Sequence, residues 1–260
     1  MKGAFKRTDF GRATSRGLQL QALLQPERMQ GLGFGFAMIP FLRRLYADPI
    51  ERGAALRRHL AYFATHPVLA GFVIGTAARL EERRAAGEPI SDQAIDGAKR
   101  AMASPLAALG DPLFWVTLRP LAGLAGVLAL ILLPPPPSGS PDFRVLLCPL
   151  VLFLTYNAVA LPYRLAGVVR GYLDGDRPAA LLRSLHLSER NAVLERVGAF
   201  AFGALLALAA LRPGTGGAAV VHAGGNAVVW TLVVTPLALG LVIGLAGRRA
   251  GFTGWTCTAC

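Results

Sequence analysis

The sequence predicts an all-α integral membrane protein, with discontinuous or re-entrant helical hairpins in the N-terminal half followed by about four transmembrane helices. Three observations favour this fold class. The 260 residues are 53% hydrophobic with a mean hydropathy of +0.47, and only 16% are charged, whereas soluble domains carry about 25% charged residues. Several uncharged runs approach the length of about 20 residues that spans a bilayer. Arginine is concentrated between some of these runs and nearly absent between others.

The first part of the chain is predicted not to span the membrane. Residues 1–17 should be a cytoplasmic tail, because the N-terminus is basic and lacks the apolar core of a signal peptide. Residues 18–120 should form a re-entrant or interfacial helical region. Within it, residues 79–101 are charged and are expected to be a solvated linker, with a helix that starts at about residue 92 after the N-cap Ser91.

Three apolar runs in this region are unsuited to plain spanning helices. Residues 29–42 are too short to span a bilayer. Residues 60–78 contain His66-Pro67, and residues 104–120 contain Gly110-Asp111-Pro112 near their centre. Irregular backbone at membrane depth is tolerated where it is buried in protein or lines a cavity. We therefore interpret positions 110–112 as the tip at which two half-helices meet, facing Thr65-His66-Pro67 beside a solute path.

The C-terminal half should contain the spanning helices. Residues 121–250 hold the uncharged runs, and residues 251–260 are read as a short tail in which Cys257 and Cys260 are incidental. Cys148 is interpreted as a small core residue. The candidate spans are 121–133 (long enough if the helix starts near Leu113), 145–163, 197–211 and 227–247.

The distribution of arginine predicts the orientation in a bacterial cytoplasmic (inner) membrane. The N-terminal 100 residues, residues 164–196 and the C-terminus are rich in arginine and should be cytoplasmic, whereas positions near Gly139 and Gly216 should face outward. The formal net charge of +12 is explained by these loops, so we prefer this interpretation to nucleic-acid binding.

The sequence shows no catalytic or phosphate-binding motif and no zinc-type spacing of histidines. His59 is interpreted as a hydrogen-bonded structural histidine rather than a metal ligand. Asp111 has two readings. An ionisable residue within an apolar segment is a candidate for function, but it could instead pair with Arg119 or another arginine. Trp115 could pack as bulk or stack on a sugar, and bulk packing is preferred.

Three long motifs together resemble the IID component of the mannose/fructose/sorbose-type phosphotransferase permeases. They are PERMQGLGFGFAMIPFLRRLY (26–46), RRHLAYFATHPVLAGFVIG (57–75) and GEPISDQAIDGAKRAMASPLAALGDPLFWVTLRP (87–120). They match, in order, the family patterns E-R-M-Q-x-L-G-F, R-R-H-L-x-F-F-N-T-[HQ]-P and G-P-L-A-G-[IV]-G-D-x-[IL]-F-W-G-T-x-R-P. The similarity covers about residues 18 to 250 and is densest between 26 and 120.

The resemblance implies a permease subunit without catalytic groups or a cofactor of its own. In this family, IIC and IID together form the membrane permease for a hexose or amino sugar, and cytoplasmic IIA and IIB carry out the phosphoryl transfer. The partners implied are therefore IIC, IIB, IIA and the sugar, in an oligomer of IIC–IID pairs. We also expect the glycine-rich stretches GLGFGF and VGAFAFGALLALAAL to pack against IIC.

The chain departs from the family patterns in three places. Ala64 replaces the asparagine of N-T-[HQ]-P and removes an amide suited to sugar hydroxyls. Ser104 and Ala108 replace two glycines, and the apolar C-terminal sequence is short. These changes keep open a IID chain with a structural or regulatory role and no transport. An intramembrane enzyme that uses Asp111 and His66 is a further alternative. The candidate residues along the substrate path are Thr65, His66, Asp111, Trp115 and Arg119.

Overall fold

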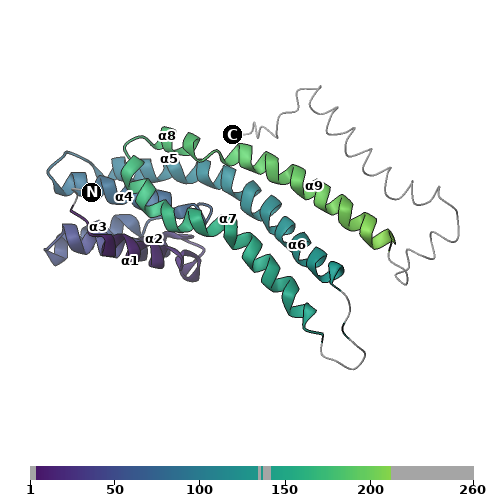
Figure 1. Ribbon diagram of the computed structural model, residues 1–260. Helices are drawn as coiled ribbons and strands as arrows, with labels where there is room; N and C mark the ends of the chain where they lie inside the picture. Colours follow the sequence, from purple (N-terminus) through teal and green to yellow (C-terminus); the bar gives the residue numbers. More distant parts are fainter. Residues whose placement is uncertain (1–3, 134–135, 137–141, 212–260) are drawn as a thin grey trace, which may run out of the picture. The chain divides into compact units, whose positions relative to one another are not determined.

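The computed structural model describes residues 4–133, 136 and 142–211, and in this part of the chain it contains helices and no strands (Figure 1). The predicted all-α fold class is confirmed. The chain divides after Glu195, and the part before this point holds the residues of interest. The elements are α1 (Arg7–Gly17), the 3-10 helix η1 (Leu20–Leu23), α2 (Gly31–Leu45), α3 (Pro49–His59), α4 (Ala70–Ala85), α5 (Asp92–Gly110), the π-helix η2 (Asp111–Leu118), α6 (Arg119–Leu132), α7 (Arg144–Asp174), α8 (Pro178–Ser184) and α9 (Leu187–Leu211).

The expected N-terminal tail contains a helix that packs on the rest of the unit. Helix α1 places Phe10 in an edge-to-face cluster with Phe5, Phe41 and Tyr172, whose ring centroids lie between 4.7 and 6.1 Å apart. Edge-to-face contacts are a favoured geometry for aromatic side chains. The cluster joins the N-terminal segment to α2 and to the C-terminal end of α7.

Glycines allow α4 and α7 to cross with their backbones in contact. A Cβ atom added to Gly75 would lie 2.1 Å from the carbonyl oxygen of Val168, and one added to Gly171 would lie 2.0 Å from that of Phe72. Small residues at a helix crossing permit this approach. Thr76 strengthens the crossing, because its hydroxyl donates to the carbonyl of Gly171 at 3.1 Å.

The glycines of GLGFGF also pack within the chain. Added Cβ atoms on Gly31 and Gly33 would lie 2.3 Å from the carbonyl oxygen of Ala61 and 2.4 Å from that of Leu20. These glycines are therefore used within this chain, and packing of the stretch against a partner subunit stays a prediction. Its glycines serve the close approach of α2 to the segment before α4 and to η1.

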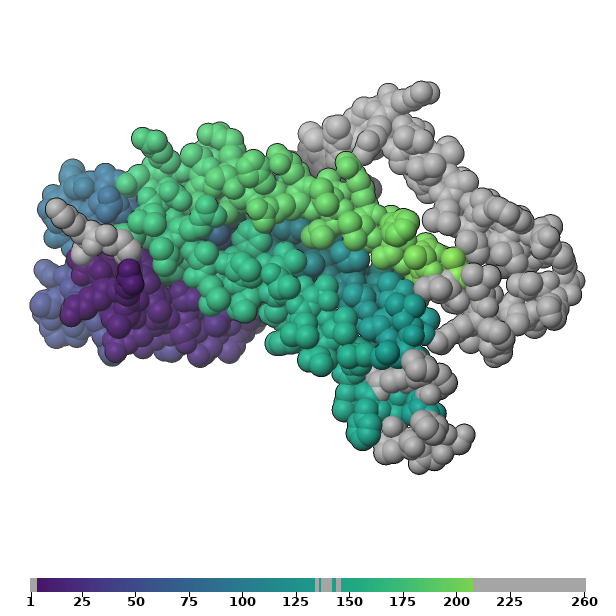
Figure 2. Space-filling view, viewed as in Figure 1, coloured from purple at the N-terminus to yellow at the C-terminus, as the bar shows by residue number. Residues whose placement is uncertain are grey.

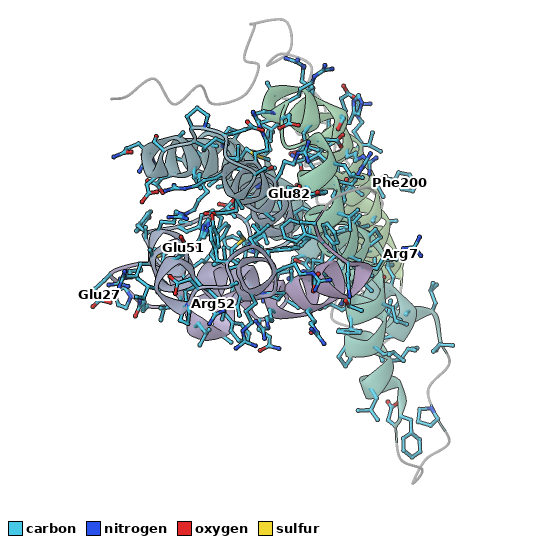
Figure 3. All side chains as sticks on the ribbon, turned by 90° about the vertical axis from the view of Figure 1, so that its left-hand side faces the viewer. Arg7, Glu27, Glu51, Arg52, Glu82 and Phe200 are labelled. Atoms are coloured by element: carbon cyan, nitrogen blue, oxygen red, sulfur yellow. The ribbon has the colours of Figure 1, made fainter. Side chains whose placement is uncertain are left out.

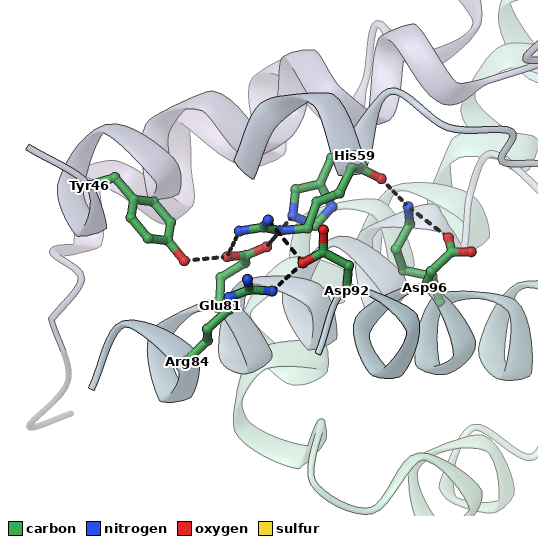
Figure 4. Close-up of polar contacts among 8 residues, drawn as sticks. Tyr46, His59, Glu81, Arg84, Asp92 and Asp96 are labelled. Atoms are coloured by element: carbon green, nitrogen blue, oxygen red, sulfur yellow. Dashed lines mark hydrogen bonds and ion pairs between the residues drawn. The ribbon is translucent and has the colours of Figure 1, made fainter. Parts of the chain in front are cut away.

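The carboxylate of Glu81 lies at the centre of a buried polar cluster that joins four helices (Figure 4). Glu81 comes from α4 and is fully buried. It accepts hydrogen bonds from Arg58 at 2.7 and 3.2 Å and from His59 at 2.8 Å, both at the end of α3. Tyr46, which follows α2, donates to the second carboxylate oxygen at 2.7 Å. Arg58 in turn pairs with Asp92 on α5 at 3.3 Å.

These contacts determine the charge states in the cluster. Burial alone would raise the pKa of Glu81, but the hydrogen bonds from His59 and Arg58 outweigh it and hold this pKa well below its usual value. Burial lowers the pKa of His59 despite the nearby carboxylate. Glu81 is therefore ionised and His59 neutral at physiological pH, with the Nε2–H of His59 donating. This arrangement agrees with the prediction that His59 is a hydrogen-bonded structural histidine.

The region 79–101 is not the solvated linker that its charge predicts. Glu81 is buried, and Lys99 is only 2% exposed, with its ammonium group 5.0 Å from the ring centre of Phe34 and 3.4 Å from the carbonyl of Arg58. The correction has a physical reason, because each buried charge has partners on other helices. The predicted N-cap is confirmed, since the Ser91 side chain accepts from the Ala94 N–H at 3.1 Å and α5 starts at Asp92.

The stretch 104–120 is continuous helix rather than the tip of a hairpin. Helix α5 passes at Gly110 into η2, which continues as α6 from Arg119. Pro112 has no N–H for an α-helical bond, and the wider π-helical turn lets the chain continue past it. The interpretation of positions 110–112 as the meeting point of two half-helices is therefore wrong. The break at His66-Pro67, in contrast, lies between α3 and α4.

Helices α6 and α7 form an apolar arm that extends beyond α1 to α5 (Figure 1 and Figure 2). The described residues contain two helices long and apolar enough to cross a membrane, Asp92–Leu132 and Leu146–Asp174. The first has 41 residues, so it is about 60 Å long at 1.5 Å per residue, about twice the thickness of a bilayer core. A span of about 20 residues is supplied by η2 and α6 together, and most charged residues of this helix lie in α5.

The remaining sequence predictions have mixed outcomes. The run 145–163 lies within α7, which passes through Pro149 and Pro162. The arginine-rich segment 164–196 is helical and comprises the last turns of α7, all of α8 and the start of α9. The run 197–211 belongs to α9. The run 227–247, the tail 251–260 and most of the proline-rich turn fall outside the described residues.

Removing the charge of Glu81 should destabilise the chain strongly. We expect Glu81→Gln to lower the free energy of unfolding by about 3–5 kcal/mol at neutral pH, because Arg58 is left in a buried site without a counter-charge. Thermal unfolding of the detergent-solubilised chain, followed by circular dichroism, measures this loss. The difference from wild type should shrink as the pH falls below the ordinary pKa of a glutamate, since a carboxylate with a lowered pKa loses its stabilising contribution in acid.

Glu88→Gln is the matched control. Glu88 pairs with Arg83 at 2.6 Å, but both side chains are exposed to solvent. Exposed ion pairs contribute about 0–1 kcal/mol, so this variant should unfold close to wild type. Equal losses for the two variants would contradict a special role for the buried cluster.

Candidate functional site

The loop between α3 and α4 is held in place by the side chain of Gln30. Gln30 is buried, and its amide donates to the carbonyl of Thr65 at 2.8 Å and accepts from the Thr65 N–H at 3.0 Å. The backbone N–H of Gln30 donates to the carbonyl of Phe63 at 2.8 Å. Met29 adopts a left-handed backbone with φ of 50°, a conformation that is uncommon for such a residue. The E-R-M-Q and T-H-P motifs are therefore bound directly to each other.

The same loop is fastened to α5 and η2. The hydroxyl of Thr65 donates to the carbonyl of Ala103 at 2.9 Å, so this donor is already used within the protein. Gly110 lies against His66, because an added Cβ atom would be 2.6 Å from the Cβ atom of His66. The predicted proximity of Thr65-His66 to Gly110 is thus present, although Gly110 belongs to a continuous helix.

The imidazole of His66 is buried against two aromatic rings of η2. Its ring stacks on Phe114, with centroids 4.9 Å apart and planes 20° apart, and its centroid lies 5.0 Å from that of Trp115. The Val68 N–H donates to Nδ1 at 3.3 Å, which leaves the proton of the neutral ring on Nε2. In the described part of the chain, Nε2 is buried and has no hydrogen-bond partner.

Burial keeps His66 neutral. Desolvation by burial, together with the positive charge of Arg164, lowers the pKa of His66 to about 4. At physiological pH the side chain therefore offers a single unpaired N–H donor. An unpaired buried donor costs free energy, so its presence next to two aromatic rings marks a candidate binding site.

Asp111 supplies an unpaired acceptor one residue beyond Gly110. Its side chain is partly buried, and within the described residues it forms no hydrogen bond or ion pair. The alternative reading as an ion pair with Arg119 has no support, because Arg119 is exposed and does not contact it. Asp111 opens the π-helix, a geometry that is frequent at functional sites.

The other candidates lie in different surroundings. The Trp115 side chain is 46% exposed, so one part contacts His66 and another is open. Ala64 is half-buried beside Thr65. Among the described residues, no group of three or more His, Cys, Asp or Glu side chains is placed to hold a metal ion.

Sequence reasoning missed three residues that build this site. Gln30 and Phe114 lie within the quoted motifs, but nothing in the local pattern shows that they contact the loop at His66. Arg164 follows the uncharged run 145–163, and in the sequence it indicates only the topology.

Tyr163 lies edge-on to Phe114, with ring centroids 5.7 Å apart. Since Tyr163 ends the uncharged run of α7, the His66–Phe114 contact marks one end of the apolar arm.

Comparison with known proteins gives the family. The family model described as the PTS system mannose/fructose/sorbose family IID component matches residues 4–210. The chain belongs to this IID family. The IID chain is 42% identical over 187 residues to the PTS system mannose-specific EIID component of Escherichia coli (strain K12), which covers 69% of this chain and 60% of that protein.

Other relatives carry the names of different sugars. The IID chain is 35% identical over 181 residues to the fructose permease IID component of Bacillus subtilis (strain 168), covering 69% of this chain and 62% of that one. The match to the sorbose-specific EIID component of Klebsiella pneumoniae is 44% over 156 residues, covering 60% of this chain and 53% of that one. The IID chain thus spans between about half and three fifths of these curated relatives.

A solved structure supports the same fold. A chain in the cryo-EM structure of the mannose transporter ManYZ with microcin E492 matches with a TM-score of 0.59 and 31% identity, over 95% of this chain and 97% of that chain. The family and the apolar arm together establish the IID chain as a helical membrane protein.

The protonation of His66 can be followed through Trp115. In a variant with Trp230→Phe and Trp255→Phe, Trp115 is the remaining tryptophan, and its fluorescence should change when the nearby imidazole becomes charged. We expect the pH midpoint near 4, because burial disfavours the imidazolium ion. His66→Gln should abolish the transition. A midpoint near 6.5, the usual value of histidine, would show that His66 is not buried against η2.

Proposed function

We propose that this chain is the IID subunit of a sugar permease in the bacterial inner membrane and forms the translocation path together with IIC. The observation that carries the proposal is the pair of unpaired polar groups, the His66 Nε2–H and the Asp111 carboxylate, at one end of the apolar arm. The family match supports the same conclusion. By the positive-inside rule this end is cytoplasmic, because arginines follow it on α7.

The chemistry of the site fits a neutral hexose or amino sugar. Such a ligand needs donors and acceptors that replace water at its hydroxyl groups. His66 supplies a donor and Asp111 an acceptor, while the exposed part of Trp115 offers an apolar face against which a sugar ring can lie. Thr65 contributes by holding the loop, since its hydroxyl is bound to Ala103. Ala64 lies beside the site and lacks the amide found in the family motif, so it is a position at which sugar preference can differ.

Phosphoryl transfer is assigned to other proteins. We propose that IIA and IIB carry phosphate to the sugar at the cytoplasmic end of the path and that the IID subunit is not catalytic. A phosphorylated sugar is charged and does not recross hydrocarbon. We propose that a sugar bound by His66 and Asp111, at the cytoplasmic end of the arm, is within reach of IIB.

Transport provides the test of this proposal. Asp111→Asn keeps the shape of the side chain and removes its charge. We expect it to lower labelled-sugar uptake at low sugar concentration by about tenfold or more, since a hydrogen bond to a charged group contributes about 1.5–3 kcal/mol. The assay uses cells that express the chain with its own IIC, IIA and IIB, and a panel of hexoses and amino sugars identifies the substrate.

Two measurements make the result specific. Asp174→Asn changes an exposed carboxylate near the end of α7 and should leave uptake unchanged. Co-purification with IIC should be equal for wild type and Asp111→Asn, because Asp111 has no described partner whose loss would unfold the chain. If Asp111→Asn leaves the uptake of every sugar unchanged, the proposed path is refuted. If the variant loses its association with IIC, Asp111 serves assembly instead.

A further inference from the structure

A groove of about 520 Å³ lies between α1 and α7. Its walls are mainly apolar and come from Phe10 on α1, from Leu18 just after it, and from Leu165 and Val169 on α7. Leu18 and Leu165 are 43% and 51% exposed. The volume lies within the range of about 300–1,000 Å³ that small-molecule pockets occupy, and the proposed sugar site does not use it.

The hydropathy of α7 predicts that the groove lies at the boundary between hydrocarbon and water. Leu165 and Val169 follow Arg164, the first charged residue after the uncharged run of α7. Helix α1 runs beside this part of α7 with Phe10 buried and with basic residues on its exposed side. The apolar side of α1 packs on Phe41 and Tyr172, and its cationic side is left free for lipid headgroups, as in interfacial amphipathic helices.

The charge around the groove is of one sign. Arg7 lines the groove and lies on the outer side of α1 (Figure 3), and Lys6 and Arg12 are exposed nearby. Within the described residues no carboxylate pairs with Arg7. Asp9, the single acidic residue of α1, is buried and accepts from the Lys6 N–H at 2.9 Å. It therefore does not neutralise the rim.

We propose that this groove binds an anionic phospholipid. One acyl chain lies between Phe10, Leu18 and Leu165, and the phosphate is held by Arg7 at the headgroup level. Thr14 and Ser15, which also line the groove, offer hydroxyl donors to the ester oxygens of the glycerol. Each basic residue near an anionic membrane surface contributes about 1 kcal/mol to binding, which a zwitterionic lipid does not supply.

The test compares lipid binding in variants of the complete IIC–IID complex. The complex is purified in detergent, titrated with phosphatidylglycerol or phosphatidylcholine, and the bound lipid is counted by native mass spectrometry. We expect Arg7→Gln to weaken phosphatidylglycerol binding by about fivefold, the factor for one basic residue at an anionic surface. Gly11→Leu should abolish binding, because Gly11 lines the groove and a Cβ atom added there meets no atom within 4 Å, so the leucine side chain has room to occupy the groove.

Two matched controls separate the groove from general effects. Gly97→Leu adds the same side chain at a position on α5 that is also open within 4 Å, and Arg183→Gln removes an exposed arginine of α8. Both should bind phosphatidylglycerol like wild type. Equal binding of the two lipids, or equal losses in the controls, would overturn the proposal. Loss of IIC from Gly11→Leu with lipid binding retained would also overturn it, since IIC would then cover the groove.

Discussion

The buried carboxylate of Glu81 is the interaction on which the arrangement of the N-terminal helices depends. Its two oxygen atoms are bound by groups from the ends of α2 and α3, and Arg58 extends the contact to α5. Breaking a buried ion pair is costly because the remaining charge stays desolvated. The helices can separate only if several charged and polar groups lose their partners together, so the cluster fixes the positions of α3, α4 and α5.

This cluster also determines where the candidate site lies. Arg58 and His59 are in the motif that continues, seven residues after His59, to His66. One end of this stretch is held by Glu81, and the other is held by the two hydrogen bonds between Gln30 and Thr65. The short connection therefore holds His66 in contact with Gly110 and with the aromatic rings of η2. The conformational stability of these N-terminal helices is in this way coupled to the geometry of the proposed sugar path.

The sequence predicts features that depend on local signals and misses those that depend on tertiary contacts. The helix start after Ser91 and the uncharged run of α7 follow from capping and hydropathy, and both are present. The continuity of the helix through Pro112 could not be predicted, because proline normally ends a helix. The π-helical turn that accommodates Pro112 depends on tertiary packing. Glu81 lies among charged neighbours, so its burial depends on partners that are distant in sequence. From the sequence, the site is predicted only as two polar interruptions of apolar runs. The contributions of Gln30 and Phe114 are not predicted.

A cryo-EM structure of the IIC–IID complex with a bound hexose tests most directly whether the site at the end of the apolar arm contacts the transported sugar. The predicted result is a sugar hydroxyl within hydrogen-bond distance, about 2.7–3.2 Å, of the Asp111 carboxylate and the His66 Nε2 atom, with the sugar ring against Trp115. A sugar bound elsewhere in the complex, with Asp111 and Trp115 facing lipid, would contradict this assignment.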